Sequence, residues 1–286
     1  MKKKKTIFLK KFWKIFIVEF FLFSLTLILG ITTAFKSNKI LTIQKIEIPQ
    51  ISFWRFIFQF FLASIFIFLI IRLIKTKKKK RLIFKILFVL TIFLGGVLML
   101  SVWIPDIISL ILISVLILWW WKQPSILIQD LCMILAIAGV GSILGLTLAP
   151  EIVMALLIIF SVYDFIAVYK TKHMIEMAKE MVKSRAVLGL IIPPNLSAFF
   201  EPLKEIKPGG EFLILGGGDI VFPLLFCCSL IPFGILKSLI VGFFSLIGLS
   251  VSFWFFLSQK KRQPIPALPP IALFSILGYL ITKLIY

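Results

Sequence analysis

Residues 212–231 read FLILGGGDIVFPLLFCCSLI, an apolar stretch that contains three consecutive glycines and a single charged residue, Asp219. About 20 apolar residues are enough for one helix to cross the hydrocarbon core of a bilayer, so this stretch predicts a membrane-spanning helix. Burying an ionisable side chain in hydrocarbon is costly, and such residues are rare outside functional positions. Asp219 is therefore the first candidate for a functional residue.

Eight further apolar stretches, of 15 to 24 residues, are predicted to be spans as well. They cover residues 16–35, 56–71, 86–104, 107–121, 125–148, 152–169, 234–257 and 268–285. Three separators are very short, and each contains a proline (Pro105, Pro150 or Pro232) that disfavours one continuous helix through the break. The sequence therefore predicts an all-α, polytopic membrane protein with nine transmembrane helices.

The nine predicted helices form a single membrane domain over residues 1–286. Spans one to six lie within residues 1–170, a polar loop covers 170–211, and spans seven to nine lie within 212–286. An amphipathic stretch within the loop, around His173–Arg185, is typical of a segment on the membrane surface.

The composition indicates a chain that is surrounded by lipid. Its 286 residues are 60% hydrophobic with 31 phenylalanines, and the mean hydropathy is +1.11, more than a soluble core of this size can bury. The net charge of +20 comes from short basic clusters between apolar runs, which favours contacts with the bilayer and argues against a nucleic-acid partner. Cys132, Cys227, Cys228 and the single histidine, His173, have no metal-site spacing, so we expect no metal and no cofactor.

The distribution of positive charge predicts the orientation in the membrane. All but six of the 32 lysines and arginines fall in segments that share one side when nine spans are counted. The six on the other side are Lys36, Lys39, Lys45, Arg55, Lys237 and Lys283. Because cytoplasmic loops are enriched in Lys and Arg, we expect a cytoplasmic N-terminus and an external C-terminus in the cell membrane.

Most of the acidic residues lie in predicted loops or at span ends, where solvated charges are ordinary. Glu19 and Asp130 lie inside spans but close to the cytoplasmic boundary. There we expect them to reach lipid headgroups or to pair with lysines such as Lys14 and Lys122. Only Asp164 and Asp219 are too deep for that explanation.

The two deep aspartates lie on consecutive, antiparallel spans at similar predicted depths. With a rise of about 1.5 Å per residue, Asp164 lies ~9 Å from Lys170 and Asp219 lies ~12 Å from Glu211 at the cytoplasmic ends of their spans. Two close carboxyl groups do not ionise together cheaply and so share a proton, as in aspartic proteases. Depth alone leaves three alternatives open: a catalytic pair, a hydrogen-bonded pair that joins two helices, and the proton relay of a transporter.

Three local motifs surround these positions: Tyr163-Asp164, Gly216-Gly217-Gly218-Asp219 and Pro266-Ala267-Leu268. The glycines remove side chains and so permit close approach of backbone or substrate. The prolines keep the entry to the last span non-helical, and exposed backbone there can pair with an extended peptide. All three motifs are predicted at the cytoplasmic side.

Together these motifs resemble the YD, GxGD and PAL motifs of the presenilin and signal peptide peptidase family, in the same order along the chain. The resemblance implies an intramembrane aspartyl endopeptidase that hydrolyses peptide bonds in transmembrane-helix substrates by general acid/base catalysis. It implies that Asp164 and Asp219 are catalytic. It further implies substrate-positioning roles for Gly216, Gly217, Gly218, Pro266, Ala267, Leu268 and Tyr163.

Within the family, the predicted orientation favours a presenilin, because signal peptide peptidases are inverted, and the chain is most similar to a prokaryotic, archaeal homologue. Its short external loops offer little surface for accessory subunits, so none is expected to be obligatory, whereas a homo-oligomer is possible.

Two other functions are alternatives to proteolysis by a presenilin-like enzyme. A proton-coupled transporter or ion channel would use the same aspartates, but the internal repeats of transporters are missing. A prepilin peptidase would lack the PAL motif.

Overall fold

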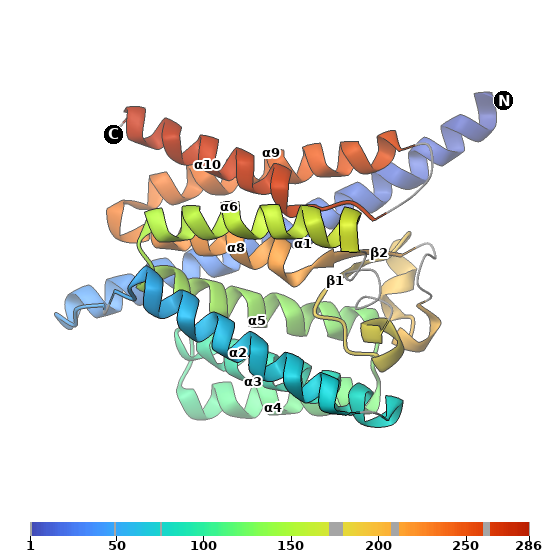
Figure 1. Cartoon of the computed structure of the whole chain (residues 1–286), viewed down its shortest axis with the longest axis horizontal. Helices are drawn as coiled ribbons and strands as arrows, with labels where there is room; N and C mark the ends of the chain where they lie inside the picture. The colour runs from blue at the N-terminus through green and yellow to red at the C-terminus, as the bar shows by residue number, and fades with distance from the viewer. Residues whose placement is uncertain are drawn as a thin grey trace.

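The computed structural model describes residues 2–48, 50–74, 76–171, 180–206, 212–259 and 264–285, and nine helices of 13 residues or more account for most of this part of the chain. They run side by side in a bundle (Figure 1). Their bounds are α1 Lys2–Ile43, α2 Phe53–Leu73, α3 Lys77–Ser101, α4 Asp106–Lys122, α5 Ile126–Thr147, α6 Pro150–Ile166, α8 Gly217–Ser229, α9 Ile235–Ser258 and α10 Leu268–Ile285.

Each of the nine predicted spans overlaps one of these helices, and the crossing of the membrane by all nine stays a prediction. Among the described residues, six helical stretches are long and apolar enough to cross a membrane. They are Phe12–Ile43, Arg81–Ser101, Ile126–Thr147, Pro150–Lys170, Ile235–Ser258 and Leu268–Ile285. His173 and most of the predicted amphipathic stretch lie outside the described residues.

Helix α5 forms the centre of the bundle, where it packs against α1, α3 and α8. Glycines allow these helices to approach closely: a methyl group at Gly139 of α5 would overlap the backbone of Gly95 in α3, and one at Gly141 would meet Leu224 of α8. Small residues at such crossings maximise van der Waals contact where lipid removes the hydrophobic driving force. The hydrophobic core therefore surrounds α5.

The prediction of an all-α chain is wrong in one place, because the structure contains a two-stranded antiparallel sheet. Strand β1 (Gly189–Ile192) pairs with β2 (Leu213–Gly216), with Gly189 opposite Gly216 and Ile192 opposite Leu213. The helix predicted over 212–231 consequently begins only at Gly217. Glycine is a poor helix former, and pairing with β1 satisfies the backbone groups of residues 213–216 without a helix.

Short helical turns complete the connections at both ends of the bundle. A π-helical turn, η1 (Ala167–Thr171), continues α6, and 3-10 turns form η2 (Leu196–Phe200), η3 (Leu203–Glu205) and η4 (Ile231–Phe233). These turns link the helices without adding a further layer.

Helix α10 packs against two neighbouring helices, α9 and α6. It lies so close to α9 that a methyl group at Gly248 would be 2.6 Å from the Ile271 backbone, and Ser245 and Ser275 form a buried hydrogen bond of 2.7 Å. At its far end, the Tyr279 hydroxyl donates to Glu151 of α6 at 2.9 Å. These contacts set the position of the start of α10 relative to α6.

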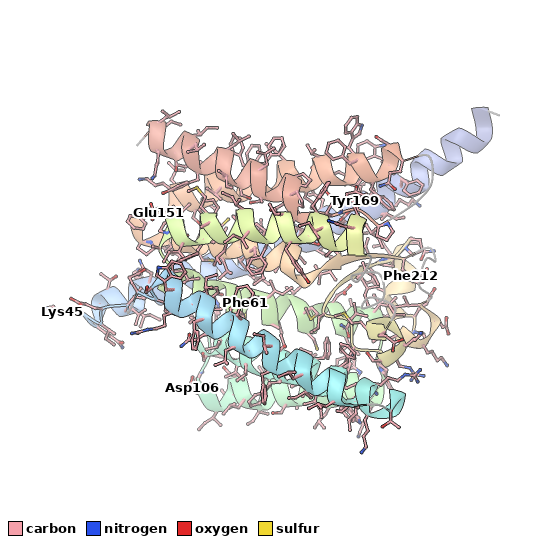
Figure 2. The ribbon with its side chains drawn as sticks, viewed as in Figure 1. Lys45, Phe61, Asp106, Glu151, Tyr169 and Phe212 are labelled. Atoms are coloured by element: carbon pink, nitrogen blue, oxygen red, sulfur yellow. The ribbon has the colours of Figure 1, made fainter. Side chains whose placement is uncertain are left out.

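The two ends of the bundle carry different elements. Helix α1 begins at the end that holds β1 and β2, whereas α10 finishes at the opposite end (Figure 1). Figure 2 places Tyr169 and Phe212 at the sheet end and Lys45, Asp106 and Glu151 at the other. The labelled residues thus fall into the same two groups as in the sequence-based prediction, and which end is cytoplasmic stays a prediction.

Candidate active site

Asp164 lies near the end of α6 on the face that packs into the bundle. Its side chain is only 4% exposed, whereas those of its neighbours Tyr163 and Phe165 are 58% and 55% exposed. Asp164 shares this inner face with Val153 and Leu157, at the spacing of one side of a helix. The π-helical turn η1 follows directly, and such turns are frequent at functional sites.

Asp219 lies in the first turn of α8 and is 7% exposed. The sequence-based estimate of its depth assumed a helix that began near Glu211, and this is wrong because β2 precedes α8. The Gly216 residue that ends β2 caps the helix with extended backbone, and its amide interacts with the Asp219 carboxyl group. A carboxylate at the third helical position commonly reaches back to the cap in this way and is favoured by the helix dipole.

The three glycines before Asp219 have different surroundings. A methyl group at Gly216 would lie 3.0 Å from an Asp219 carboxyl oxygen, and one at Gly217 would lie 3.1 Å from the Leu188 carbonyl oxygen. At Gly218 the nearest atom would be 3.8 Å away, on Phe222. A side chain at either of the first two positions would press against these neighbours, whereas Gly218 is exposed and a methyl group there would make only an ordinary contact.

Asp164 and Asp219 come together where α6 packs against α8, close enough for their carboxyl groups to interact electrostatically. Both Asp164 oxygens are buried without a hydrogen-bond partner. Buried polar atoms of this kind cost stability, and a catalytic role is one of the explanations for their presence in a native structure. The arrangement is a buried pair of acids on adjacent helices.

The Pro266-Ala267-Leu268 segment adjoins this pair. Residues 264–267 are not helical, as the prolines predicted, and α10 begins at the buried Leu268. The Leu268 backbone amide faces the Asp164 carboxyl group, at a geometry short of a hydrogen bond. The structure therefore gathers Asp164, Asp219, Gly216 and Leu268, whereas Tyr163 lies on the exposed side of α6.

Sequence reasoning missed the residues that hold the sheet beside the acids. Asp130 of α5 is buried and does not pair with Lys122; its Oδ1 atom accepts a 2.8 Å hydrogen bond from the Ile191 amide of β1. The adjacent Gln129 donates to the Val187 carbonyl oxygen just before β1. Two neighbouring polar residues inside an apolar span are the sequence signal that points to such a role.

Glu19 of α1 is a fourth buried carboxyl group, and the expectation that it pairs with Lys14 or reaches headgroups is wrong. It is 5% exposed, its Oε2 atom has no hydrogen-bond partner, and it lies within electrostatic range of Asp219. It lies on the same buried stripe of α1 as Phe12, Ile15 and Leu22. That apolar stripe, at helical spacing, could have revealed its inward orientation.

No group of three or more His, Cys, Asp or Glu side chains with the arrangement of a metal site occurs among the described residues. The residues gathered at the site offer carboxyl groups and backbone amides. Such groups perform general acid/base catalysis on a carbonyl substrate.

Comparisons with known proteins give the family and the fold. The model of the family described as signal-peptide peptidase, presenilin aspartyl protease matches residues 17–286. A search of curated proteins finds no match.

Among solved structures, a presenilin family intramembrane aspartate protease in space group C222 is 22% identical, with a TM-score of 0.62, and the match covers 94% of this chain and 97% of that one. A second structure with the same description, in space group P2, is also 22% identical, with a TM-score of 0.58 and coverage of 92% and 97%. These structures share the fold along nearly their whole length. Because the family model matches almost the entire sequence, this chain belongs to the signal-peptide peptidase and presenilin family of intramembrane aspartyl proteases.

Proposed function

We propose that Asp164 and Asp219 are the catalytic dyad of this protease and that it hydrolyses peptide bonds within transmembrane helices of other membrane proteins. The observation that carries the proposal is the electrostatic contact between these two buried carboxyl groups, one from α6 and one from α8. Each belongs to a motif that the family resemblance singles out. The transporter alternative is not favoured by the family match.

The dyad acts through a shared proton, because two adjacent carboxyl groups do not both ionise cheaply. The ionised member takes a proton from water, and the water oxygen attacks the scissile carbonyl carbon. The protonated member donates a hydrogen bond to the carbonyl oxygen and so stabilises the charge that develops there. Collapse of the tetrahedral intermediate breaks the C–N bond, and a proton passes to the leaving amine.

The substrate binds in an extended form, because the carbonyl groups of an intact helix are already hydrogen-bonded and shielded. Strand β2 supports this step: α1 and α5 pack on β1, and β2 is the outer, less buried strand of the pair. A third strand can add to such an edge through backbone hydrogen bonds. The exposed surface at Gly218 and the non-helical Pro266-Ala267 segment provide room beside this edge.

The protein acts in the cell membrane, with the dyad on the cytoplasmic side, and needs no obligatory accessory subunit. The basic clusters support the orientation. The short connections at the opposite end of the bundle leave little surface for a partner.

The experiment compares peptide cleavage by wild type, Asp164→Asn and Asp219→Asn. The purified proteins in detergent are given a fluorogenic transmembrane peptide, and the initial rate is measured. Asparagine keeps the shape of the side chain but cannot take up or hold the shared proton, so each variant should lose cleavage to the background level. Asp106→Asn, which changes an exposed aspartate at the other end of the bundle, serves as the matched control and should retain wild-type cleavage.

Wild-type rates in either dyad variant would refute the assignment. Thermal unfolding of each variant distinguishes a lost catalytic group from a lost fold. Proton flux that depended on both aspartates in liposomes, with no cleavage of any peptide, would instead favour a transporter.

A further inference from the structure

A basic pocket lies away from the dyad, where α3, the turn between α4 and α5 and the loop before β1 meet. We define it by the four cationic residues that line it: Lys85, Lys122, Arg185 and Lys204. It consists of a smaller cavity of about 110 Å³ and a wider one of about 450 Å³, and both are lined by Lys122, Pro124 and Arg185. Neither cavity is lined by an acidic side chain among the described residues.

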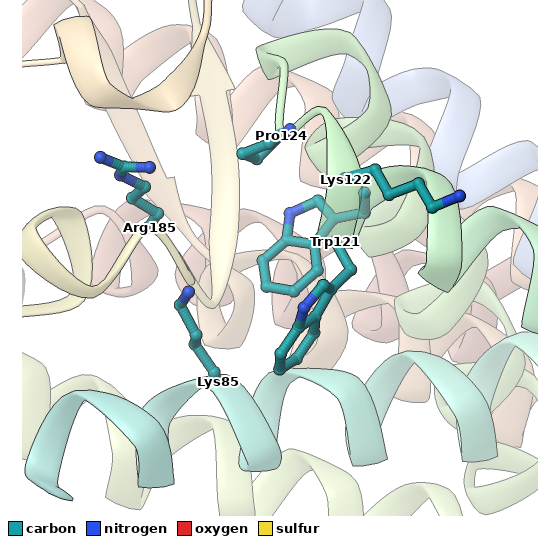
Figure 3. A pocket seen from close by; sticks show the side chains of 6 residues that line it. Lys85, Trp121, Lys122, Pro124 and Arg185 are labelled. Carbon is teal, nitrogen blue, oxygen red and sulfur yellow. The ribbon is translucent and has the colours of Figure 1, made fainter.

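Contacts within the fold position the cationic residues of the pocket. Leu203 donates a backbone hydrogen bond to Pro124 at 2.9 Å, which ties the segment carrying Lys204 to the α4–α5 turn. The Lys85 ammonium group lies 5.4 Å from the centre of the Trp121 ring, a cation–π distance. In Figure 3, Lys85 and Arg185 lie on one side of the cavity, with Trp121 across from them.

Arg185 has a backbone conformation that disfavours any residue other than glycine. Its φ is 58°, and hydrogen bonds from Arg185 to Val182 and from Ala186 to Met181 close the preceding helical turn around it. Glycine is the usual residue at such a helix end. Strained backbone conformations of this kind cluster at functional sites, so the Arg185 side chain is a candidate functional group.

The lipid-facing surface of α4 leads into the pocket. Ile107, Ile111, Val115 and Leu118 are each more than half exposed and follow one face of the helix toward Trp119, which lines the wider cavity. The helix ends in Trp119, Trp120, Trp121 and Lys122, an order typical of the boundary between hydrocarbon and headgroups. A molecule that fills the pocket can therefore place an acyl chain on α4.

We propose that the basic pocket binds the phosphate headgroup of an anionic phospholipid in the leaflet on the dyad side, with Arg185 and Lys85 on the phosphate and the acyl chains along α4. The cations attract the phosphate and supply charge-assisted hydrogen bonds. The apolar stripe selects a lipid over free phosphate. Bound lipid would link α3, α4 and the segment that leads into β1.

The test uses Arg185→Gly and a matched control, Lys45→Gly. Lys45 also has a positive φ, 53°, and is exposed, but it lies at the opposite end of the bundle. Both substitutions remove one positive charge and both relieve backbone strain, so net charge and strain relief are equal in the two variants. They differ only in whether the charge belonged to the basic pocket.

The full-length proteins in neutral detergent are titrated with dioleoyl phosphatidylglycerol, with dioleoyl phosphatidylcholine and with inorganic phosphate, and thermal unfolding is followed. A ligand that binds the folded state raises the unfolding temperature. We expect phosphatidylglycerol to raise it more than phosphatidylcholine for wild type and Lys45→Gly. For Arg185→Gly the apparent affinity for phosphatidylglycerol should fall by roughly five- to tenfold, as expected for the loss of one charge-assisted hydrogen bond.

An equal response of Arg185→Gly and Lys45→Gly to phosphatidylglycerol would overturn the proposal. Stabilisation by inorganic phosphate that matched stabilisation by phosphatidylglycerol would also overturn it, because the site would then bind free phosphate and not lipid. Failure of the dyad variants to lose cleavage would leave this result untouched, since the readout is lipid binding.

Discussion

At the scale of single residues, the three glycines of the GxGD region differ in what a side chain would contact. Gly216 lies against Asp219 itself and Gly217 against the backbone before β1, whereas Gly218 is exposed and has only Phe222 at an ordinary contact distance. From the sequence alone the three glycines cannot be told apart. Only the strand-to-helix junction distinguishes a glycine that positions the acid from one that borders the substrate surface.

We predict that Gly216→Ala and Gly218→Ala affect different kinetic constants. A methyl group at Gly216 would lie 3.0 Å from the Asp219 carboxyl group and would shift the acid by a few tenths of an ångström. Because a misplacement of ~1 Å at a catalytic site costs about a hundredfold in rate, a smaller shift should still cost several-fold. Gly216→Ala should therefore lower kcat. Gly218→Ala should mainly raise KM, by about tenfold, as one extra methyl group in a binding site does.

The measurement is steady-state cleavage of the transmembrane peptide, with Gly242→Ala in α9 as the control, because a methyl group there meets only ordinary contacts at 3.5 Å. Gly218→Ala should also leave stability unchanged or raise it by up to ~1 kcal/mol, since alanine is the better helix former. An unchanged kcat in Gly216→Ala would show that the close approach to Asp219 does not position it.

At the scale of elements, the short sheet is the feature that local sequence patterns do not predict. Strand β2 is four apolar residues that continue directly into an apolar helix, so hydropathy assigns both to one span. Its strand conformation depends on pairing with β1, some twenty residues earlier in the chain, and β1 in turn depends on the Asp130 carboxyl group. Such non-local partners leave no periodic signal.

We predict that Asp130→Ala loosens the sheet while Asp130→Asn largely preserves it. Alanine leaves the buried Ile191 amide without an acceptor, at a cost of about 1–3 kcal/mol, whereas asparagine retains a carbonyl oxygen at the same place. Hydrogen exchange measured by mass spectrometry should therefore increase in peptides covering β1 and β2 of Asp130→Ala. Peptide cleavage should fall in parallel, because β2 leads directly to Asp219.

Exchange in α9 and α10 provides the internal control for this experiment, because neither helix contacts Asp130 through the sheet. Equal protection of β1 in the alanine variant and in wild type would contradict the role of Asp130. A uniform increase across the whole chain would indicate global destabilisation instead.

At the scale of the whole molecule, hydropathy predicts the bundle well because each span is long enough to carry its own signal. The ninth predicted span, 268–285, coincides with α10, and prolines separate helices where predicted at Pro105 and Pro150. The meeting of Asp164, Asp219 and Leu268 follows from helix packing, which hydropathy does not encode. For that step the motifs and the family resemblance supplied the prediction.

The orientation of the bundle in the membrane stays a prediction, and the positions of Lys45 and Lys204 allow a direct test. Lys45 lies at the end opposite the sheet, and Lys204 lines the basic pocket near it; both are exposed. The native cysteines Cys132, Cys227 and Cys228 are buried, so a cysteine introduced at either lysine is the main site of reaction. In intact cells a membrane-impermeant maleimide should label Lys45→Cys and not Lys204→Cys, and permeabilised cells should give labelling of both. Labelling of Lys204→Cys alone in intact cells would invert the topology and place the dyad at the external side, where the positive-inside rule predicts it should not be.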